Sequence, residues 1–139
     1  MAYDYKNRMV QFTETVSGKR HTYTYDALGR LIKKVVDADG LPAETRYYYK
    51  GWQVVEERDG TDTVQATYVY GNFIDEVLTM RRLDADFYYL RDDQYNVMRI
   101  TDPNGVVVES YDYSDFGVPL DATTRQPLTG SAVGNPFFF

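Results

Sequence analysis

A short tyrosine-containing pattern recurs along the chain, and its spacing constrains the fold more than any other feature of the sequence. The six copies start at Tyr3, Tyr25, Tyr49, Tyr70, Arg91 and Tyr113, so successive starts are 22, 24, 21, 21 and 22 residues apart. A second tyrosine stands two residues before each start after the first: Tyr23, Tyr47, Tyr68, Tyr89 and Tyr111. Residues i and i+2 of a strand point to the same face, so each pair predicts two rings side by side on one surface.

Between two starts, each unit has the pattern of a strand, a turn and a returning strand. The strand segments are rich in β-branched, aliphatic and aromatic residues. Turn residues follow at 17–19, 37–40, 59–62, 84–86 and 102–105, where Asp, Asn and Gly tolerate left-handed backbone. No segment shows the 3.6-residue apolar period of a helix. Because an isolated hairpin is marginal in water, the hairpins are expected to stack edge to edge.

These patterns predict an all-β fold in which serial antiparallel β-hairpins form a twisted, spiralling repeat sheet, with essentially no helix. Residues 1–118 form the predicted hairpin array. The pattern stops at Pro119, and residues 119–139 are predicted to be a Gly/Pro-rich C-terminal loop. This loop ends in three phenylalanines, which we expect to be covered by something that follows in a longer protein.

Composition excludes several classes of partner and site. The net charge is −6, and no cluster of Lys and Arg offers a footprint for phosphate backbones or anionic lipid, which argues against nucleic acid as a partner. The chain has no cysteine, which removes disulfides, Cys-based zinc sites and thiol nucleophiles. No apolar run approaches the ~18 residues of a membrane span, so no membrane insertion is predicted. The N-terminus lacks the apolar region of a signal peptide, so an export signal would have to lie on a longer parent chain.

The sequence contains few candidates for chemistry. Residues 37–40, "DADG", could open a calcium loop, but position twelve of such a loop is Tyr48 rather than a bidentate Glu, which favours a hairpin turn. Adjacent Asp92 and Asp93 would point to opposite faces of an extended segment and could not share a proton. His21 is the only histidine, and no G-x-S-x-G motif accompanies it, so we expect a residue on the sheet surface. We therefore predict no catalytic residue, no metal site, no cofactor and no enzyme activity.

An Asp and an Arg recur together after two of the starts, in Asp4 with Arg8 and Asp26 with Arg30. Their recurrence argues against a unique active site. It predicts instead a structural ion pair, or hydrogen bonds, that holds the first bend of each unit.

The stretch "YDALGRL", with Tyr25, Asp26, Gly29, Arg30 and Leu31, closely resembles the YD repeat, also called the RHS (rearrangement hot spot) repeat. Tyr3, Asp4, Asn7, Arg8 and Met9 match the motif with conservative exchanges. Later stretches, including "GNPFFF", resemble the segment that leads into the RHS-associated core domain, so residues 119–139 are alternatively its truncated start. At other starts, Arg91 replaces the Tyr, and Lys50, Gly71 and Ser114 replace the Asp. The predicted structural signature comprises Tyr3, Asp4, Arg8, Tyr23, Tyr25, Asp26, Gly29, Arg30, Tyr47, Tyr49, Trp52, Tyr68, Tyr70, Phe73, Tyr89, Tyr111, Tyr113, Phe116 and Gly117.

The resemblance implies a segment of a hollow β-shell that encapsulates a C-terminal effector or toxin domain of a secreted or cell-surface bacterial protein. Its implied partners are neighbouring repeats and the rest of the shell. Two open sheet edges would also favour self-association. The alternative hypothesis is a carbohydrate- or cell-surface-binding adhesion module, in which Trp52 and the Tyr pairs stack on sugar rings. We expect packing between repeats to account for all of these rings. The weakest hypothesis is an enzyme, and the chain ends before the self-cleavage element of the family.

Overall fold

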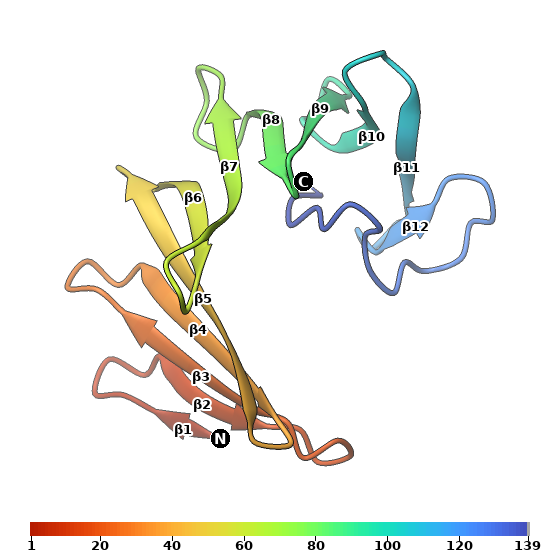
Figure 1. The fold of residues 1–139 in the computed structure, drawn as a ribbon. Helices are drawn as coiled ribbons and strands as arrows, with labels where there is room; N and C mark the ends of the chain where they lie inside the picture. Colours follow the sequence, from red (N-terminus) through yellow and green to blue (C-terminus); the bar gives the residue numbers. More distant parts are fainter. Residues whose placement is uncertain (139) are drawn as a thin grey trace. The chain divides into compact units, whose positions relative to one another are not determined.

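The computed structural model describes residues 1–138, which form β-strands joined by turns and loops (Figure 1). The strands are β1 (Ala2–Tyr3), β2 (Met9–Thr13), β3 (Arg20–Tyr25), β4 (Leu31–Ala38), β5 (Leu41–Lys50), β6 (Gln53–Asp59), β7 (Val64–Tyr70), β8 (Val77–Arg82), β9 (Ala85–Arg91), β10 (Val97–Thr101), β11 (Val107–Tyr113) and β12 (Pro119–Asp121). Within this described range there is no helix, and the all-β prediction is confirmed. In particular, residues 1–138 include no helix that is long and apolar enough to cross a membrane.

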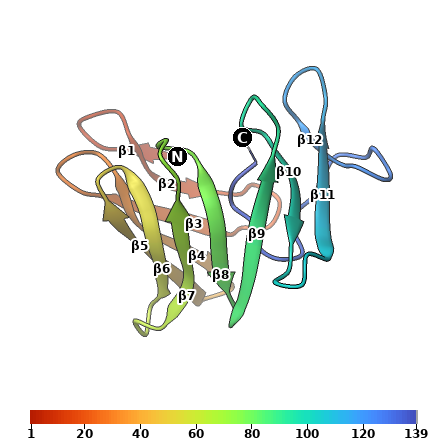
Figure 2. The ribbon, with the colours of Figure 1, turned by 90° about the horizontal axis from the view of Figure 1, so that it is seen from above.

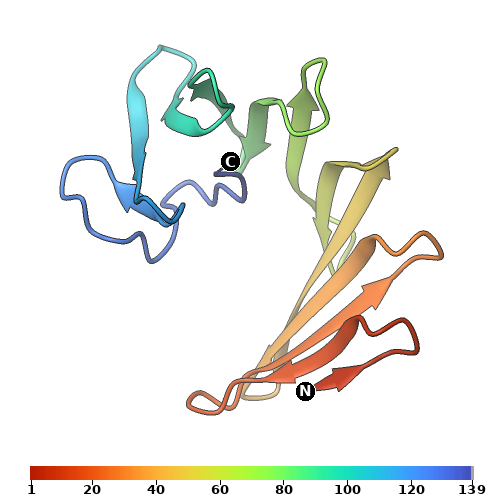
Figure 3. The same cartoon turned by 180° about the vertical axis from the view of Figure 1, so that it is seen from behind.

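The chain divides into two compact units, unit 1 up to Gln65 and unit 2 from Ala66 onward. In unit 1 the antiparallel strand order runs from β1 to β6 as in the chain, and in unit 2 it runs from β7 to β12. Figures 2 and 3 show these successive hairpins from two further directions. The division at residue 118 inferred from the sequence concerns the repeat pattern and stays a prediction. The sheet nevertheless continues past that point, because β12 pairs with β11 through Tyr113 and Pro119.

Two-residue turns close the far ends of two hairpins. Asp39 and Gly40 have φ values of +55° and +78°, which a tight β4–β5 hairpin requires of both central residues. The predicted turn at 84–86 is wrong: Leu83 and Asp84 form the β8–β9 turn, with φ values of +52° and +60°. Asp86 lies in β9 opposite Arg81, and this cross-strand pair fixes the register that leaves Leu83 in the turn.

The most deeply buried apolar side chains lie in unit 2. Met80, Ile100, Val77 and Val97 are fully enclosed, and the first tyrosines of three junction pairs, Tyr68, Tyr89 and Tyr111, are buried beside them. The cover over this face is the C-terminal segment, whose Phe137 and Phe138 rings pack edge-on against the tyrosines. Phe137 and Phe138 thus pack on their own chain and remain half-exposed, and the expectation of a further cover from a longer protein stays a prediction. Phe139 lies outside the described residues.

We expect Gly40→Ala to destabilise the fold by roughly 1 to 2 kcal/mol, because a Cβ is disfavoured in left-handed backbone. A Cβ at Gly40 meets no atom within 4 Å, so the cost is one of backbone conformation alone. Urea unfolding followed by circular dichroism measures the change. Gly130→Ala is the matched control, because Gly130 also has open space but lies outside the left-handed region. Equal destabilisation by the two changes would contradict the explanation.

Candidate functional site

Two repeat starts, at Tyr3 and Tyr25, carry both the Asp and the Arg of the motif, and we call them the complete starts. Each of them is a turn that one aspartate holds in place. Asp26 Oδ1 accepts the backbone N–H of Arg30 at 2.9 Å, and its Oδ2 accepts the Arg30 Nε at 2.7 Å and Nη2 at 2.6 Å. The Gly29 N–H donates to the Asp26 carbonyl at 3.0 Å, with Gly29 at a φ of +91°. Asp4 and Arg8 repeat this geometry, with Asn7 at a φ of +58° in the place of the glycine. In both starts the aspartate thus forms an ion pair with the arginine and also accepts hydrogen bonds from the turn, so both of the predicted interactions are present.

The electrostatics of these turns favour a permanently ionised carboxylate. Hydrogen bonds from Arg8, first from its backbone N–H, hold the pKa of Asp4 below its ordinary value. Burial raises the pKa of Asp26, but the backbone and side-chain hydrogen bonds and the charge of Arg30 together outweigh it, and the net pKa is lowered. A carboxylate held in this way is a poor general acid at neutral pH.

The start at Arg91 keeps the same turn. Asp92 Oδ1 accepts the backbone N–H groups of Gln94 and Asn96 at 2.9 Å each, and its Oδ2 accepts the Asn96 side-chain amide at 2.9 Å. Asn96 therefore stands where the arginine stands in the complete repeats. Asp92 and Asp93 lie in this turn, so the argument from an extended segment does not apply to them.

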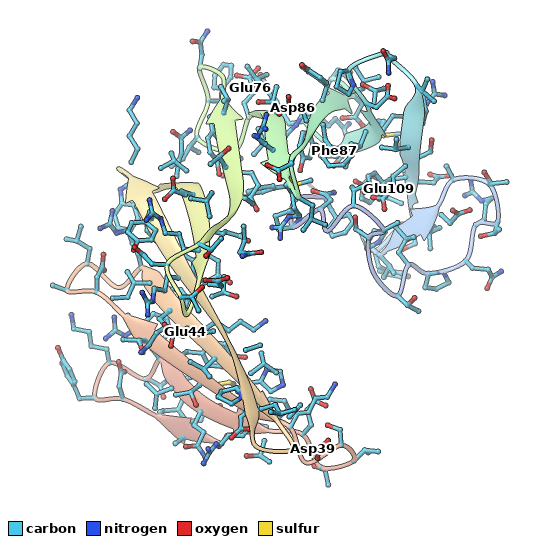
Figure 4. The ribbon with its side chains drawn as sticks, viewed as in Figure 1. Asp39, Glu44, Glu76, Asp86, Phe87 and Glu109 are labelled. Atoms are coloured by element: carbon cyan, nitrogen blue, oxygen red, sulfur yellow. The ribbon has the colours of Figure 1, made fainter. Side chains whose placement is uncertain are left out.

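Two other starts supply the acceptor in different ways. Ser114 Oγ accepts the backbone N–H groups of Val118 at 3.1 Å and Phe116 at 3.3 Å, with Gly117 in left-handed backbone. At Gly71 the carboxylate comes from the other side of the turn, where Glu76 Oε2 accepts the Asn72 N–H at 2.8 Å (Figure 4). A Cβ on Gly71 would lie 2.2 Å from that oxygen, so Glu76 occupies the space of the missing aspartate side chain.

The start tyrosines connect neighbouring repeats through their hydroxyl groups. Each donates to the carbonyl six residues after the preceding start: Tyr25 to Met9 at 2.9 Å, Tyr49 to Leu31 at 2.8 Å and Tyr113 to Val97 at 2.7 Å. We call this hydrogen bond the tyrosine staple. Burial raises the pKa of Tyr49, and that of Tyr113 to about 12, so these hydroxyls remain protonated donors at neutral pH.

The arginines of the complete starts reach the next repeat as well. The guanidinium carbon of Arg8 lies 4.7 Å from the centroid of the Tyr25 ring, and that of Arg30 lies 4.8 Å from the Tyr49 ring. Arg30 also donates to the Gly51 carbonyl. Each arginine is therefore positioned by its own aspartate and packs on the tyrosine of the following repeat. This is the seam between hairpins, and in unit 1 it is formed by the second tyrosine of each junction pair.

Two aromatic side chains at the third position after a start are exposed. Trp52 is 62% exposed and Phe116 is 95% exposed. The expectation that packing between repeats accounts for the candidate rings is therefore wrong for Trp52, because this position lies inside the turn, where the chain reverses. Phe73 is also exposed, although its ring lies 5.5 Å from that of Tyr95.

The remaining residues that the sequence suggested for chemistry, His21 and the turn at 37–40, contact other side chains or form a hairpin turn. His21 Nε2 is 2.8 Å from Glu14 Oε1, and the His21 ring is 5.7 Å from that of Phe12. Asp39 lies in the hairpin turn described above. In the described part of the chain, no three or more His, Cys, Asp or Glu side chains are grouped so that they could hold a metal ion. Sequence reasoning missed Glu76 and also Glu109, whose carboxylate binds the C-terminal segment.

We expect Tyr49→Phe to lower the free energy of unfolding by about 0.5 to 1.5 kcal/mol, because it removes one hydrogen bond to the Leu31 carbonyl. Tyr48→Phe is the matched control in the same strand, because Tyr48 is exposed and its hydroxyl makes only a 3.3 Å contact with the exposed Asp62. Chemical denaturation of both variants measures the difference. Equal effects would contradict a special role for the staple.

Comparison with known proteins agrees with this geometry. Residues 3–42 match the family model described as RHS Repeat. The chain is also similar to the tRNA3(Ser)-specific nuclease WapA of Bacillus spizizenii, with 29% identity over 100 residues that make up 70% of this chain and 4% of that protein. The chain thus spans a small fraction of the length of this relative. The range that matches the RHS repeat model contains both complete Asp–Arg starts and the first tyrosine staple.

Proposed function

We propose that the chain is a non-catalytic structural segment of an RHS/YD-repeat shell, which encloses a C-terminal effector or toxin domain of a larger bacterial protein that is secreted or held at the cell surface. The observation that carries this proposal is the repeated seam. A tyrosine hydroxyl joins each of three starts to the preceding hairpin, and in two cases an arginine packs on the same ring. A wall built by adding hairpins needs such a repeated connection.

The use of the charged groups supports a structural role over catalysis. Asp4, Asp26 and Asp92 each accept backbone N–H groups of their own turn, and the first two also hold an arginine. Their lowered pKa values follow from these bonds. A constellation that recurs at successive repeat starts has the distribution of a building element rather than that of one active site.

The relative also fits this proposal. WapA carries the name of a nuclease, while this chain aligns with 4% of its length. An activity of a protein of that size can reside outside the aligned part. In our proposal this chain forms part of the shell wall, and the effector is a different segment of the larger protein.

When the chain is produced alone, we expect it to self-associate through its sheet edges. In unit 1, β1 pairs with β2, and its other edge can pair with a strand of another copy. Ala2→Lys places a charge on this edge strand and should reduce the concentration-dependent mass measured by light scattering. Val16→Lys is the matched control, because it adds the same charge at a fully exposed position outside the strands.

A monodisperse monomer across a wide concentration range would contradict this expectation. An equal reduction of the mass by both lysine substitutions would also contradict it, since general charge repulsion would then explain the effect without the edge.

The exposure of Trp52 favours one second candidate function, a module that binds carbohydrate or a cell surface. Its ring is 62% exposed in the turn between β5 and β6, and an exposed indole face can stack on a sugar. If this function holds, a glycan array gives a signal that Trp52→Ala abolishes while circular dichroism stays unchanged. Leu28→Ala, at the equivalent exposed position of the preceding repeat, should keep the signal. No signal from the unaltered chain rejects this candidate.

A further inference from the structure

The C-terminal segment 131–138 lies on the buried tyrosine face of unit 2 and contacts it residue by residue. In Figure 1 this dark-blue stretch runs back from β12 toward β8 and β9. Asn135 is 5% exposed and connects two tyrosines: its Oδ1 accepts the Tyr89 hydroxyl at 2.8 Å, and its Nδ2 donates to the Tyr111 hydroxyl at 3.2 Å. These two tyrosines occupy equivalent positions in successive repeats, so the side-chain amide of Asn135 spans the distance between two repeats.

The two phenylalanines add apolar and main-chain contacts. The Phe137 ring meets Tyr68, Tyr70 and Tyr89 edge-on, with centroids 5.1, 6.2 and 6.4 Å away. The Phe138 carbonyl accepts the Val97 backbone N–H at 2.8 Å and the Tyr113 hydroxyl at 2.5 Å. The hydroxyl that forms a tyrosine staple therefore also holds the end of the segment. Buried rings and main-chain bonds together are the usual basis of peptide recognition.

Gly134 is selected by space and by backbone conformation. Its φ is +69°, and a Cβ there would lie 3.0 Å from the Cδ of Arg82, whose Nη2 donates to the Tyr68 hydroxyl at 2.9 Å. A larger residue would strain the turn and displace that arginine. In the sequence Gly-Asn-Pro-Phe-Phe, the tyrosine face of unit 2 thus makes specific contacts with four residues: Gly134, Asn135, Phe137 and Phe138.

Glu109 anchors the start of the segment. Its carboxylate accepts the Ser131 hydroxyl at 2.8 Å and the Val133 N–H at 3.2 Å, and it also accepts the Ala132 N–H and the Tyr111 hydroxyl (Figure 4). Between β12 and this anchor, residues 122–130 contain no strand, and most of them are exposed. The segment is thus attached to its site through a surface loop, and none of the contacts named above requires that attachment.

We propose that the tyrosine face of unit 2 is a peptide-binding site for Gly-Asn-Pro-Phe-Phe, which residues 134–138 occupy in cis and which the same segment of a second copy of this chain occupies in exchange. The contacts are the same whichever chain supplies the segment, which is the condition under which exchange between copies costs little. The loop 122–130 provides the length over which the two chains can cross.

The binding test uses the full chain and a fluorescent peptide, "SAVGNPFF", which reproduces residues 131–138. In the unaltered chain the tethered segment competes at an effective concentration on the order of millimolar, so the peptide should bind weakly. Asn135→Ala weakens the tethered segment but leaves Tyr89, Tyr111 and Glu109 in place. We expect it to bind the peptide about tenfold or more tightly than the unaltered chain does, as measured by fluorescence anisotropy.

Two controls and a second variant make the result specific. A peptide in which Ala replaces Asn should lose the gain in affinity, because it cannot bridge the two tyrosines. Thr129→Ala, in the exposed loop outside the segment, should bind the peptide as weakly as the unaltered chain. Gly134→Ala is a second variant that weakens the tethered segment, used if Asn135→Ala does not keep the native circular dichroism. Absence of the gain in a folded variant, or an equal gain with the Ala peptide, overturns the proposal.

Exchange between copies is tested by complementation. Asn135→Ala has an intact face and a weakened segment, whereas Tyr89→Phe has an intact segment and a weakened face. We expect a mixture of the two to form more heterodimer in native mass spectrometry than either forms homodimer, because only the mixed pair joins an intact face to an intact segment. A statistical mixture of dimers, such as general association through sheet edges produces, overturns the exchange.

Discussion

The hydrogen bond from a start tyrosine to a carbonyl of the preceding repeat is the interaction on which the hairpin array depends. Backbone pairing alone allows one hairpin to slide along the next, since a ladder repeats every two residues. A partly buried hydroxyl that finds its acceptor at one position removes that freedom. Tyr49 illustrates this, because its hydroxyl reaches Leu31 while its ring lies against Arg30, and both contacts fix the same register.

The Asp–Arg turn supports this interaction from within the repeat. Asp26 aligns Arg30, and Arg30 presents a flat cation to the ring of Tyr49. Three of the starts that lack this pair keep one part of it. Asp92, Ser114 and Glu76 all provide an oxygen that accepts the N–H groups of the turn, although they differ in residue type and position. At these three starts a side-chain acceptor for the turn remains, although the residue that supplies it varies.

Much of this architecture could be predicted from the sequence, and the failures have identifiable physical causes. Tyr25, Asp26, Gly29 and Arg30 act within one local motif, so spacing alone reveals their roles. Glu76 was missed because it replaces a side chain from five residues away. Asn135 was missed because its partners, Tyr89 and Tyr111, lie 46 and 24 residues distant and become neighbours only when the segment folds back. The turn at Leu83 was missed because strand register, rather than residue preference, placed a leucine there.

The tyrosine staple has a direction. Tyr25 bonds back to Met9, Tyr49 to Leu31 and Tyr113 to Val97, so the donor in each pair comes later in the chain than the acceptor. The ribosome therefore synthesises the residue that carries the acceptor carbonyl before the tyrosine that donates to it. During synthesis each of these three hydrogen bonds can therefore form only after the following tyrosine has emerged, so the later repeat completes a contact of the repeat made before it.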